Sequence, residues 1–104
     1  MDAQFKKGIL EMCILYKVGQ EELYGYDIMK YMGVFFPEVD ESTFYAILRR
    51  LNKEGLTESY YGEVSNGPKR KYYRISEKGR ESLAKSIEDW GKLQGIIKEM
   101  GIEK

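Results

Sequence analysis

Nine residues, NGPKRKYYR at positions 66–74, combine cations, aromatic rings and a turn sequence. Lysine ammonium and arginine guanidinium groups bind phosphate oxygens, so this segment is suited to contact nucleic acid. Between residues 66 and 80 a single acid, Glu77, stands against six cations, which gives a local charge of +5. The six are Lys69, Arg70, Lys71, Arg74, Lys78 and Arg80. The other interpretation is a solvated basic face, which is common on proteins.

The net charge of the chain gives no reason to expect a nucleic-acid partner. Seventeen lysine and arginine residues balance 17 aspartate and glutamate residues, so the formal charge is zero. Screening acts over about 8 Å at physiological ionic strength, however, so acids on a distant face change the potential at residues 66–80 very little. The prediction of a phosphate-binding segment therefore depends on local charge.

Other side chains offer little catalytic or metal-binding chemistry. Histidine is absent, which excludes Ser-His and Cys-His dyads and removes the usual ligands of a zinc site. The acidic pairs Glu22 with Asp27 and Asp40 with Glu41 could act as acid and base or hold magnesium, but helix capping and solvation explain them more simply. The single Cys13 fits a small core residue better than a nucleophile. We expect no enzyme activity, no metal site and no cofactor.

The composition predicts one folded domain. With 104 residues, of which 42% are hydrophobic and 33% charged, the chain matches a single globular unit and not a disordered tail. Its longest apolar run, Met12 to Tyr16, is far shorter than the ~20 residues of a membrane helix. Lys6 and Lys7 faintly resemble the start of a secretory signal, but Glu11 interrupts the apolar region that follows. We therefore expect a cytoplasmic protein.

Two amphipathic helices are predicted at the start of the chain. The first has a buried stripe at helical spacing and ends at Gly19; its apolar members are Phe5, Ile9, Met12, Cys13 and Tyr16. The second begins near Tyr24 or Gly25 and ends at the Phe35-Phe36-Pro37 corner, because proline disfavours a helical residue before it. Its apolar residues are Ile28, Met29, Tyr31 and Met32.

A third helix is predicted to bury one face and present polar groups on the other. Asp40 is its expected N-cap, Glu41 lies in the first turn and Gly55 supplies the C-terminal stop. The buried stripe comprises Phe44, Ile47, Leu48 and Leu51. The other face carries Ser42, Thr43, Tyr45, Arg49, Arg50 and Lys53. Hydroxyls, a phenol and cations can contact phosphates and base edges in a major groove. Alternatively, Tyr45 packs against the second helix and Arg49 only solvates the surface.

An antiparallel two-stranded hairpin and a long helix complete the predicted elements. Strand residues rich in tyrosine flank the turn Asn66-Gly67-Pro68, with Thr57, Tyr60, Tyr61 and Val64 before it and Tyr72, Tyr73 and Ile75 after it. Of Tyr72 and Tyr73, one is expected to pack on the helices and the other to lie nearer solvent. Ser76 caps a helix that ends near Met100 at Gly101. Its seam comprises Leu83, Trp90, Leu93, Ile97 and Met100, with Ile87 alongside. Gly91 and Gly95 within it predict a bend, fraying or the close approach of another backbone.

The order of helix, helix, helix and hairpin predicts a winged helix-turn-helix, of the α+β class and mainly α. Within one domain, residues 1–76 form the expected winged unit and residues 77–104 the expected C-terminal dimerisation helix.

The motifs together resemble the PadR family of bacterial transcriptional regulators. The resemblance rests on Leu23-Tyr24-Gly25-Tyr26-Asp27-Ile28, on Ser42 to Leu51, on Glu54-Gly55-Leu56 and on Gly67 to Arg80. The chain differs from the family in having Ala46 where proline is frequent, which a helix accommodates easily. It also ends soon after one C-terminal helix, which is similar to the shorter branch of the family.

The resemblance implies a homodimeric repressor that binds double-stranded DNA at a pseudo-palindromic operator. The predicted DNA contacts are Ser42, Thr43, Tyr45, Arg49 and Lys53 on the third helix and Lys69 and Arg70 near the hairpin tip. In the shorter branch the last helix packs with the first helix of the partner. This implies a dimer interface of Phe5, Ile9, Met12, Leu83, Ile87, Trp90, Leu93 and Ile97.

Two alternatives remain at this point. Trp90 is either a plain interface anchor or, as in multidrug-responsive relatives, a surface on which a flat aromatic effector stacks. The whole chain is either the DNA-binding regulator or a winged-helix module that binds a protein through its tyrosine-rich hairpin.

Overall fold

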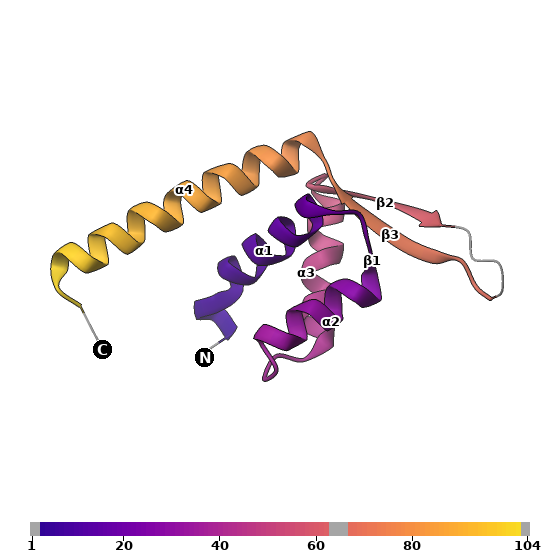
Figure 1. Cartoon of the computed structure of the whole chain (residues 1–104), viewed down its shortest axis with the longest axis horizontal. Coiled ribbons are helices and arrows are strands. Elements are labelled where there is room, and N and C mark those ends of the chain that lie inside the picture. Colours follow the sequence, from indigo (N-terminus) through magenta and orange to yellow (C-terminus); the bar gives the residue numbers. More distant parts are fainter. Residues whose placement is uncertain (1–2, 63–66, 103–104) are drawn as a thin grey trace.

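Three helices pack together in the middle of the molecule, between a hairpin that projects on one side and a long last helix on the other (Figure 1). The computed structural model describes residues 3–62 and 67–102. Helix α1 spans Ala3–Gln20, α2 spans Gly25–Phe35 and α3 spans Glu41–Lys53, and each helix packs against the other two. The expected bounds of the second and third helices are confirmed.

The three helices and one strand enclose an apolar core. Its buried residues are Leu10, Ile14, Leu15, Val18, Ile28, Met29, Met32, Phe44, Ile47, Leu48, Leu51, Tyr73 and Ile75. The predicted stripe of α3 is therefore buried in full, and its polar residues are left to the other face and the flanks. Burying one stripe fixes the rotation of α3 about its axis, which in turn decides which side chains it presents.

The predicted stripe of α1 was wrong as a core stripe. Leu10, Ile14, Leu15 and Val18 enter the core, whereas Tyr16 is 46% exposed. Ile9, Met12 and Cys13 are only half-buried, and Phe5 lies outside the residues whose side chains are described. Apolar residues surround much of α1, so helical spacing fits two different faces. Ile9, Met12 and Tyr16 lie on a second apolar face of α1, and Cys13 packs against the margin of the core. The helix also continues past Gly19 to Gln20.

The C-terminus of α3 ends at glycine, as predicted. Gly55 has a φ of 79°, in the left-handed region that favours glycine. The Leu56 N–H donates to the Leu51 carbonyl at 2.9 Å, and the Gly55 N–H donates to the Asn52 carbonyl at 3.1 Å. These two bonds make a Schellman motif, which turns the chain directly into the next strand. At the other end Asp40 occupies the N-cap position, although its side chain makes no capping hydrogen bond.

The sheet has three strands, one more than predicted. Strands β2, Thr57–Gly62, and β3, Arg70–Ile75, form the expected antiparallel hairpin, with Thr57 opposite Ile75 and Gly62 opposite Arg70. The additional strand β1, Leu23–Tyr24, pairs with the other edge of β3, so the order is β1-β3-β2. Two residues are too few to give a periodic signal. Val64 and Asn66 of the predicted hairpin lie outside the described residues.

Helix α4, Glu77–Met100, starts against the loop that follows α3. The Ser76 hydroxyl accepts a hydrogen bond from the Gly79 N–H at 3.0 Å, which confirms the predicted cap. The same hydroxyl donates to the Gly55 carbonyl at 2.6 Å. A Cβ atom on Gly79 would lie 2.0 Å from the Leu56 carbonyl oxygen. No side chain fits at this position, which explains why glycine stands where a capping box would have glutamate.

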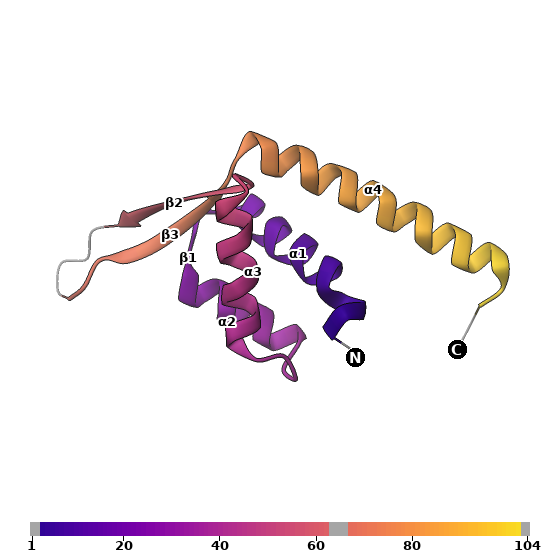
Figure 2. The ribbon, with the colours of Figure 1, turned by 180° about the vertical axis from the view of Figure 1, so that it is seen from behind.

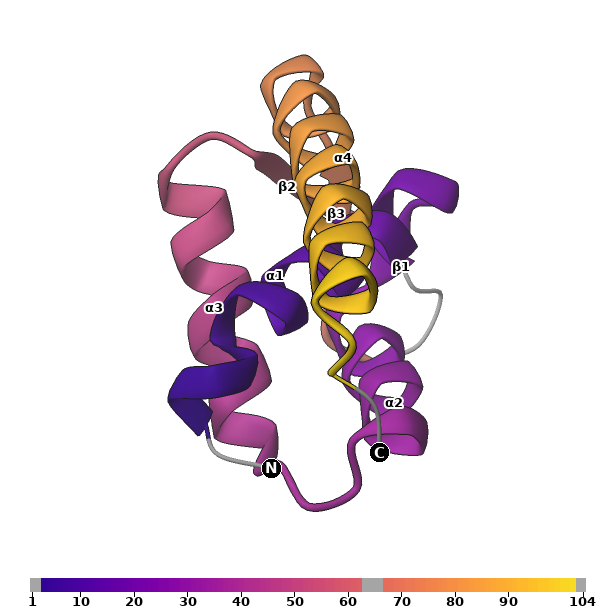
Figure 3. The same cartoon turned by 90° about the vertical axis from the view of Figure 1, so that its left-hand side faces the viewer.

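Beyond its first turns α4 leaves the body of the molecule (Figures 1 and 2). The radius of gyration is 15.5 Å, against about 13 Å for a compact chain of this length. All residues from 87 to 100 are exposed. The helix is uninterrupted through Gly91 and Gly95, and Gly101, with a φ of 82°, ends it as predicted. The predicted fraying at these glycines is therefore absent. Figure 3, which looks along α4, shows it passing over α1.

Candidate nucleic-acid interface

The face of α3 that points away from the core is polar and accessible. Four of the five residues predicted there, Ser42, Tyr45, Arg49 and Lys53, are exposed. Among the described residues, neither Arg49 nor Lys53 has a carboxylate within ion-pair distance. Their positive charges are therefore available to an external anion.

Thr43 lies apart from the other four. It is half-buried and lines a groove between α3 and α1, and its N–H donates to the Asp40 carbonyl at 3.0 Å. The reason is geometric, because each residue of a helix is rotated by about 100° from the one before it. Thr43 consequently faces the flank of α3 and not its outward side.

From sequence, Tyr45 could either contact DNA or pack against the second helix, and its position in the structure is intermediate between the two. Its side chain is 38% exposed, so it both packs against the body and reaches solvent. Partial burial and, next, the nearby Glu41 carboxylate raise the pKa of the Tyr45 phenol. The hydroxyl therefore stays protonated at neutral pH and can donate or accept a hydrogen bond at the surface.

The β2–β3 hairpin, which we call the wing, projects on the side of α3 opposite the N-terminal half of α1 (Figure 2). Lys69 and Arg70, the predicted phosphate contacts, are both exposed. Tyr73 is 7% exposed and belongs to the core, whereas Tyr72 points to the other face of the sheet. The predicted division of the two tyrosines is confirmed, because neighbouring residues of a strand face opposite sides.

Aromatic rings on the outer face of the sheet join the wing to β1. The Tyr72 ring lies between Tyr60, stacked at 5.7 Å between centroids, and Tyr24 at 6.0 Å. Gly62 leaves room for the Tyr72 ring, since a Cβ there would meet it at 2.5 Å. The Arg70 guanidinium lies 5.0 Å from the centroid of the Tyr24 ring. This arrangement restrains the described strands of the wing and places the Arg70 guanidinium, near the tip, beside the Tyr24 ring.

The local charge excess divides into engaged and free cations. Arg74 pairs with Glu58 at 3.8 Å, and the Lys78 amine donates to the Glu54 carbonyl at 2.9 Å. Within the described residues the other four cations have no carboxylate partner; of these, Arg80 lies on α4, and the remaining three are Lys69, Arg70 and Lys71. Three cations near the tip of the wing, and not six, are therefore the relevant group.

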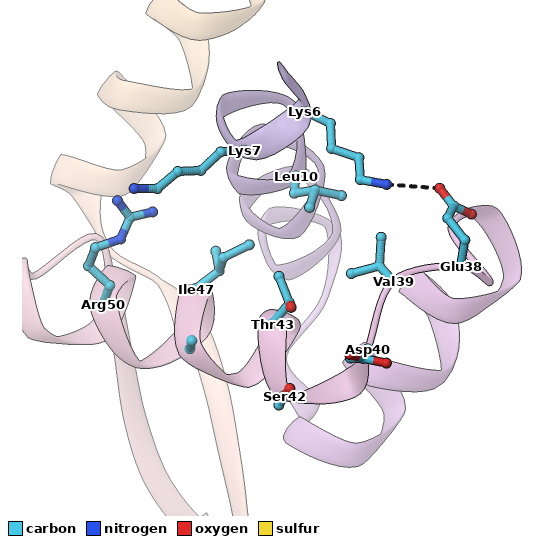
Figure 4. Close-up of a pocket in the computed structure, with 11 residues that line it drawn as sticks. Lys6, Lys7, Leu10, Glu38, Val39, Asp40, Ser42, Thr43, Ile47 and Arg50 are labelled. Atoms are coloured by element: carbon cyan, nitrogen blue, oxygen red, sulfur yellow. Dashed lines mark hydrogen bonds and ion pairs between the residues drawn. The ribbon is translucent and has the colours of Figure 1, made fainter. Parts of the chain in front are cut away.

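A groove that no sequence pattern predicts lies between α1 and α3 (Figure 4). It encloses about 710 Å³, with Leu10, Val39 and Ile47 among its apolar lining. Lys6, 3% exposed, pairs with Glu38 at 3.0 Å, and Arg50 pairs with Glu11. A hydrogen bond from its own main-chain N–H, and then the bond from Lys6, lower the pKa of the Glu38 carboxyl. The one feature of the sequence that belongs to this groove is the Lys6-Lys7 pair, which from sequence alone resembled the start of a secretory signal.

A second surface is apolar and follows α4. Of the residues predicted at a dimer interface, Ile87, Trp90, Leu93 and Ile97 are between 37% and 47% exposed, while Leu83 packs against the core. Ile96, Met100 and Ile102 extend this surface. Near its start a hollow of about 340 Å³ is lined by Met12, Cys13, Tyr16, Tyr31 and Ile87. The misplaced stripe of α1 therefore adjoins the apolar face of α4.

The described part of the chain presents no cluster of acidic residues or cysteine with the geometry of a metal site. Residues 3–62 and 67–102 also contain no helix with the length and apolar character of a membrane span.

Comparison with known proteins yields one consistent family. The model of the transcriptional regulator PadR-like family matches residues 14–85. A PadR-like transcriptional regulator from Bacillus cereus is 39% identical; the match covers 97% of this chain and 99% of that one, with a TM-score of 0.84. A PadR-like transcription factor from Bacteroides fragilis is 32% identical over 94% of this chain and 95% of its own, with a TM-score of 0.81. An uncharacterised protein of Lysinibacillus sphaericus is 36% identical over 94 residues, which are 88% of this chain and 86% of that protein.

Proposed function

This chain belongs to the PadR-like family of transcriptional regulators, and we propose that it represses transcription as a homodimer that binds a pseudo-palindromic DNA operator. One observation supports the DNA-binding part above all others. The outward face of α3 exposes Ser42, Arg49 and Lys53, and neither of these two cations has an ion-pair partner among the described residues. The wing, with its own cations, lies on one side of α3 (Figure 2).

In the proposed complex α3 enters the major groove and the wing follows the neighbouring backbone. A major groove about 12 Å wide admits one α-helix, and Ser42, Tyr45, Arg49 and Lys53 then reach base edges and phosphates. Lys69 and Arg70 contact phosphates, which position the protein without reading sequence. Thr43 is at most a flank contact, because it faces the groove toward α1.

The proposed dimer forms through the apolar face of α4 and the second apolar face of α1. This assigns residues 1–76 to the DNA-binding unit and residues 77–104 to dimerisation, inside one domain. Exposed isoleucine, leucine and tryptophan side chains along a helix that leaves the body support this assignment. Two-fold symmetry of the dimer is the reason to expect a pseudo-palindromic operator.

Salt-dependent binding to duplex DNA tests the DNA-binding part. We expect the logarithm of the affinity to fall with the logarithm of salt concentration, with a slope of about −0.9 for each phosphate contact. The double variant Lys69→Ala/Arg70→Ala should weaken binding to all sequences similarly and make that slope shallower. The matched control Lys85→Ala/Lys92→Ala removes two exposed cations of α4 and should leave the slope unchanged.

The outcome also separates the regulator from the alternative protein-binding module. No DNA binding by the wild-type chain, or a nearly flat salt response, would favour a module that docks a protein through the hairpin. Loss of affinity for one sequence only in the wing variant would mean that the wing reads bases.

We further propose that a flat aromatic effector stacks on Trp90 and releases the operator. Trp90 is 37% exposed on α4, where a second chain would meet it in the proposed dimer. The effector must favour a dimer with a different separation of the two α3 helices, since equal affinity for both states would shift nothing. Titration of flat aromatic compounds should change both Trp90 fluorescence and DNA affinity, and no change in either would refute this part.

A further inference from the structure

The groove between α1 and α3 opens beside the proposed DNA-binding face. Ser42 and Ala46 are exposed on α3 and also line the groove, so the two surfaces are continuous. Figure 2 shows α3 between the wing on one side and the N-terminal half of α1 on the other. Whatever lies along α3 is therefore bordered by both elements.

The cations that line this groove differ in whether they are paired with a carboxylate and in how exposed they are. Lys6 is committed to Glu38 at 3.0 Å, and the Lys6 side chain is only 4% exposed. Arg50 is paired with Glu11 but remains 35% exposed. Lys7 is exposed and has no carboxylate partner in the part of the chain that the structure describes. Lys7 is thus the cation of this groove that is free to bind an external anion.

Lys7 and Arg50 both line the groove and carry the same charge. Figure 4 shows the Lys7 amine extended from α1 toward the Arg50 guanidinium on α3, above Ile47. The structure pairs one carboxylate, that of Glu11, with this group. Two cations and one carboxylate leave an excess of +1, which a second anion would neutralise. At the other end of the groove Glu38 and Asp40 disfavour an anion.

We propose that Lys7, together with Arg50, binds a backbone phosphate of the DNA on the side of α3 opposite the wing. This inference rests on the proposed function and extends it. A helix in the major groove has a sugar-phosphate strand on each side. The wing supplies cations for one strand, and the Lys7–Arg50 group supplies them for the other. Phosphate contacts on both sides of α3 would fix its rotation in the major groove of the DNA.

Three single variants test this assignment, with a 30-base-pair duplex of mixed sequence as the probe. The affinity of each variant for the fluorescently labelled duplex would be measured by fluorescence anisotropy between 50 and 200 mM KCl. The melting temperature of each variant would also be measured. Lys7→Gln should lower affinity about tenfold at 50 mM and make the salt slope shallower by roughly 2 per dimer, one contact from each protomer. Lys85→Gln, the same change on α4, should alter neither quantity. Glu11→Gln removes the competing carboxylate and should raise affinity severalfold.

Each failure has a separate meaning. If the wild-type protein does not bind the duplex, the proposed function itself fails. If it binds and Lys7→Gln changes neither affinity nor slope, or changes them no more than Lys85→Gln does, the contact at Lys7 is refuted while the proposed function stands. Weaker binding by Glu11→Gln with an unchanged melting temperature would refute the role of Arg50.

Discussion

At the first turn of α4, the absence of one side chain allows two segments of backbone to touch. The Ser76 N–H donates to the Leu56 carbonyl at 3.1 Å, and Gly79 lies directly against that same carbonyl. The junction fixes where α4 starts relative to α3. Through it, the position of the proposed dimerisation helix is tied to the position of the proposed recognition helix.

We expect Gly79→Ala to destabilise the protein strongly. Its Cβ would lie 2.0 Å from the Leu56 oxygen and 2.8 Å from Ile75 Cγ1, and the first of these atoms is backbone, which cannot rotate away. Overpacking of this kind costs about 1–3 kcal/mol. At one fixed protein concentration, the midpoint of thermal unfolding should fall by at least several degrees.

Gly33→Ala is the matched control, because it lies within α2 and an added Cβ meets no atom within 4 Å. Alanine is favoured over glycine in a helix by about 1 kcal/mol, so this variant should be unchanged or slightly more stable. Equal melting temperatures for the two variants would contradict the close contact at Gly79.

At the scale of the elements, the features that depend on residues close together in the sequence were predicted correctly. These are the rotation of α3 about its axis and the two ends of α4. The stripe of α3 has a single apolar face, so its rotation and its outward residues followed from spacing alone. The two ends of α4 could be predicted in the same way, because the capping hydrogen bonds of Ser76 and Gly101 involve residues only three or four positions away in the sequence. Long-range packing was not needed for either prediction.

The errors arose where more than one face was apolar or where partners lay far away in sequence. α1 has apolar residues on two sides, and only its contacts with α2 and α3 decide which side enters the core. β1 consists of two residues and exists because β3, almost 50 residues later, offers a free edge. The Lys6–Glu38 and Arg50–Glu11 pairs bridge 32 and 39 residues, so no local pattern could reveal the groove.

At the scale of the whole molecule, both the elongated shape and the exposed apolar surface support the proposed dimer. The chain is 56 Å long but only 20 Å thick, and much of its length comes from a helix without a covering layer. Dimeric helix-turn-helix proteins read half-sites one turn of DNA apart, about 34–36 Å, so something must hold two recognition helices at that spacing. In the proposed dimer α4 does this, and dimerisation and specific DNA binding should fail together.

Leu93→Asp tests that coupling. The side chain is 47% exposed on the apolar face of α4, and burying an unpaired carboxylate between two chains costs several kcal/mol. We expect sedimentation velocity to show monomers, and the affinity for a selected operator to fall at least a hundredfold because each half-site then binds alone. Lys92→Asp is the adjacent control, since Lys92 pairs with Glu88 away from the apolar face, and it should remain dimeric. A Leu93→Asp protein that stays dimeric would place the interface elsewhere. If it becomes monomeric with unchanged operator affinity, α4 would not set the spacing of the recognition helices.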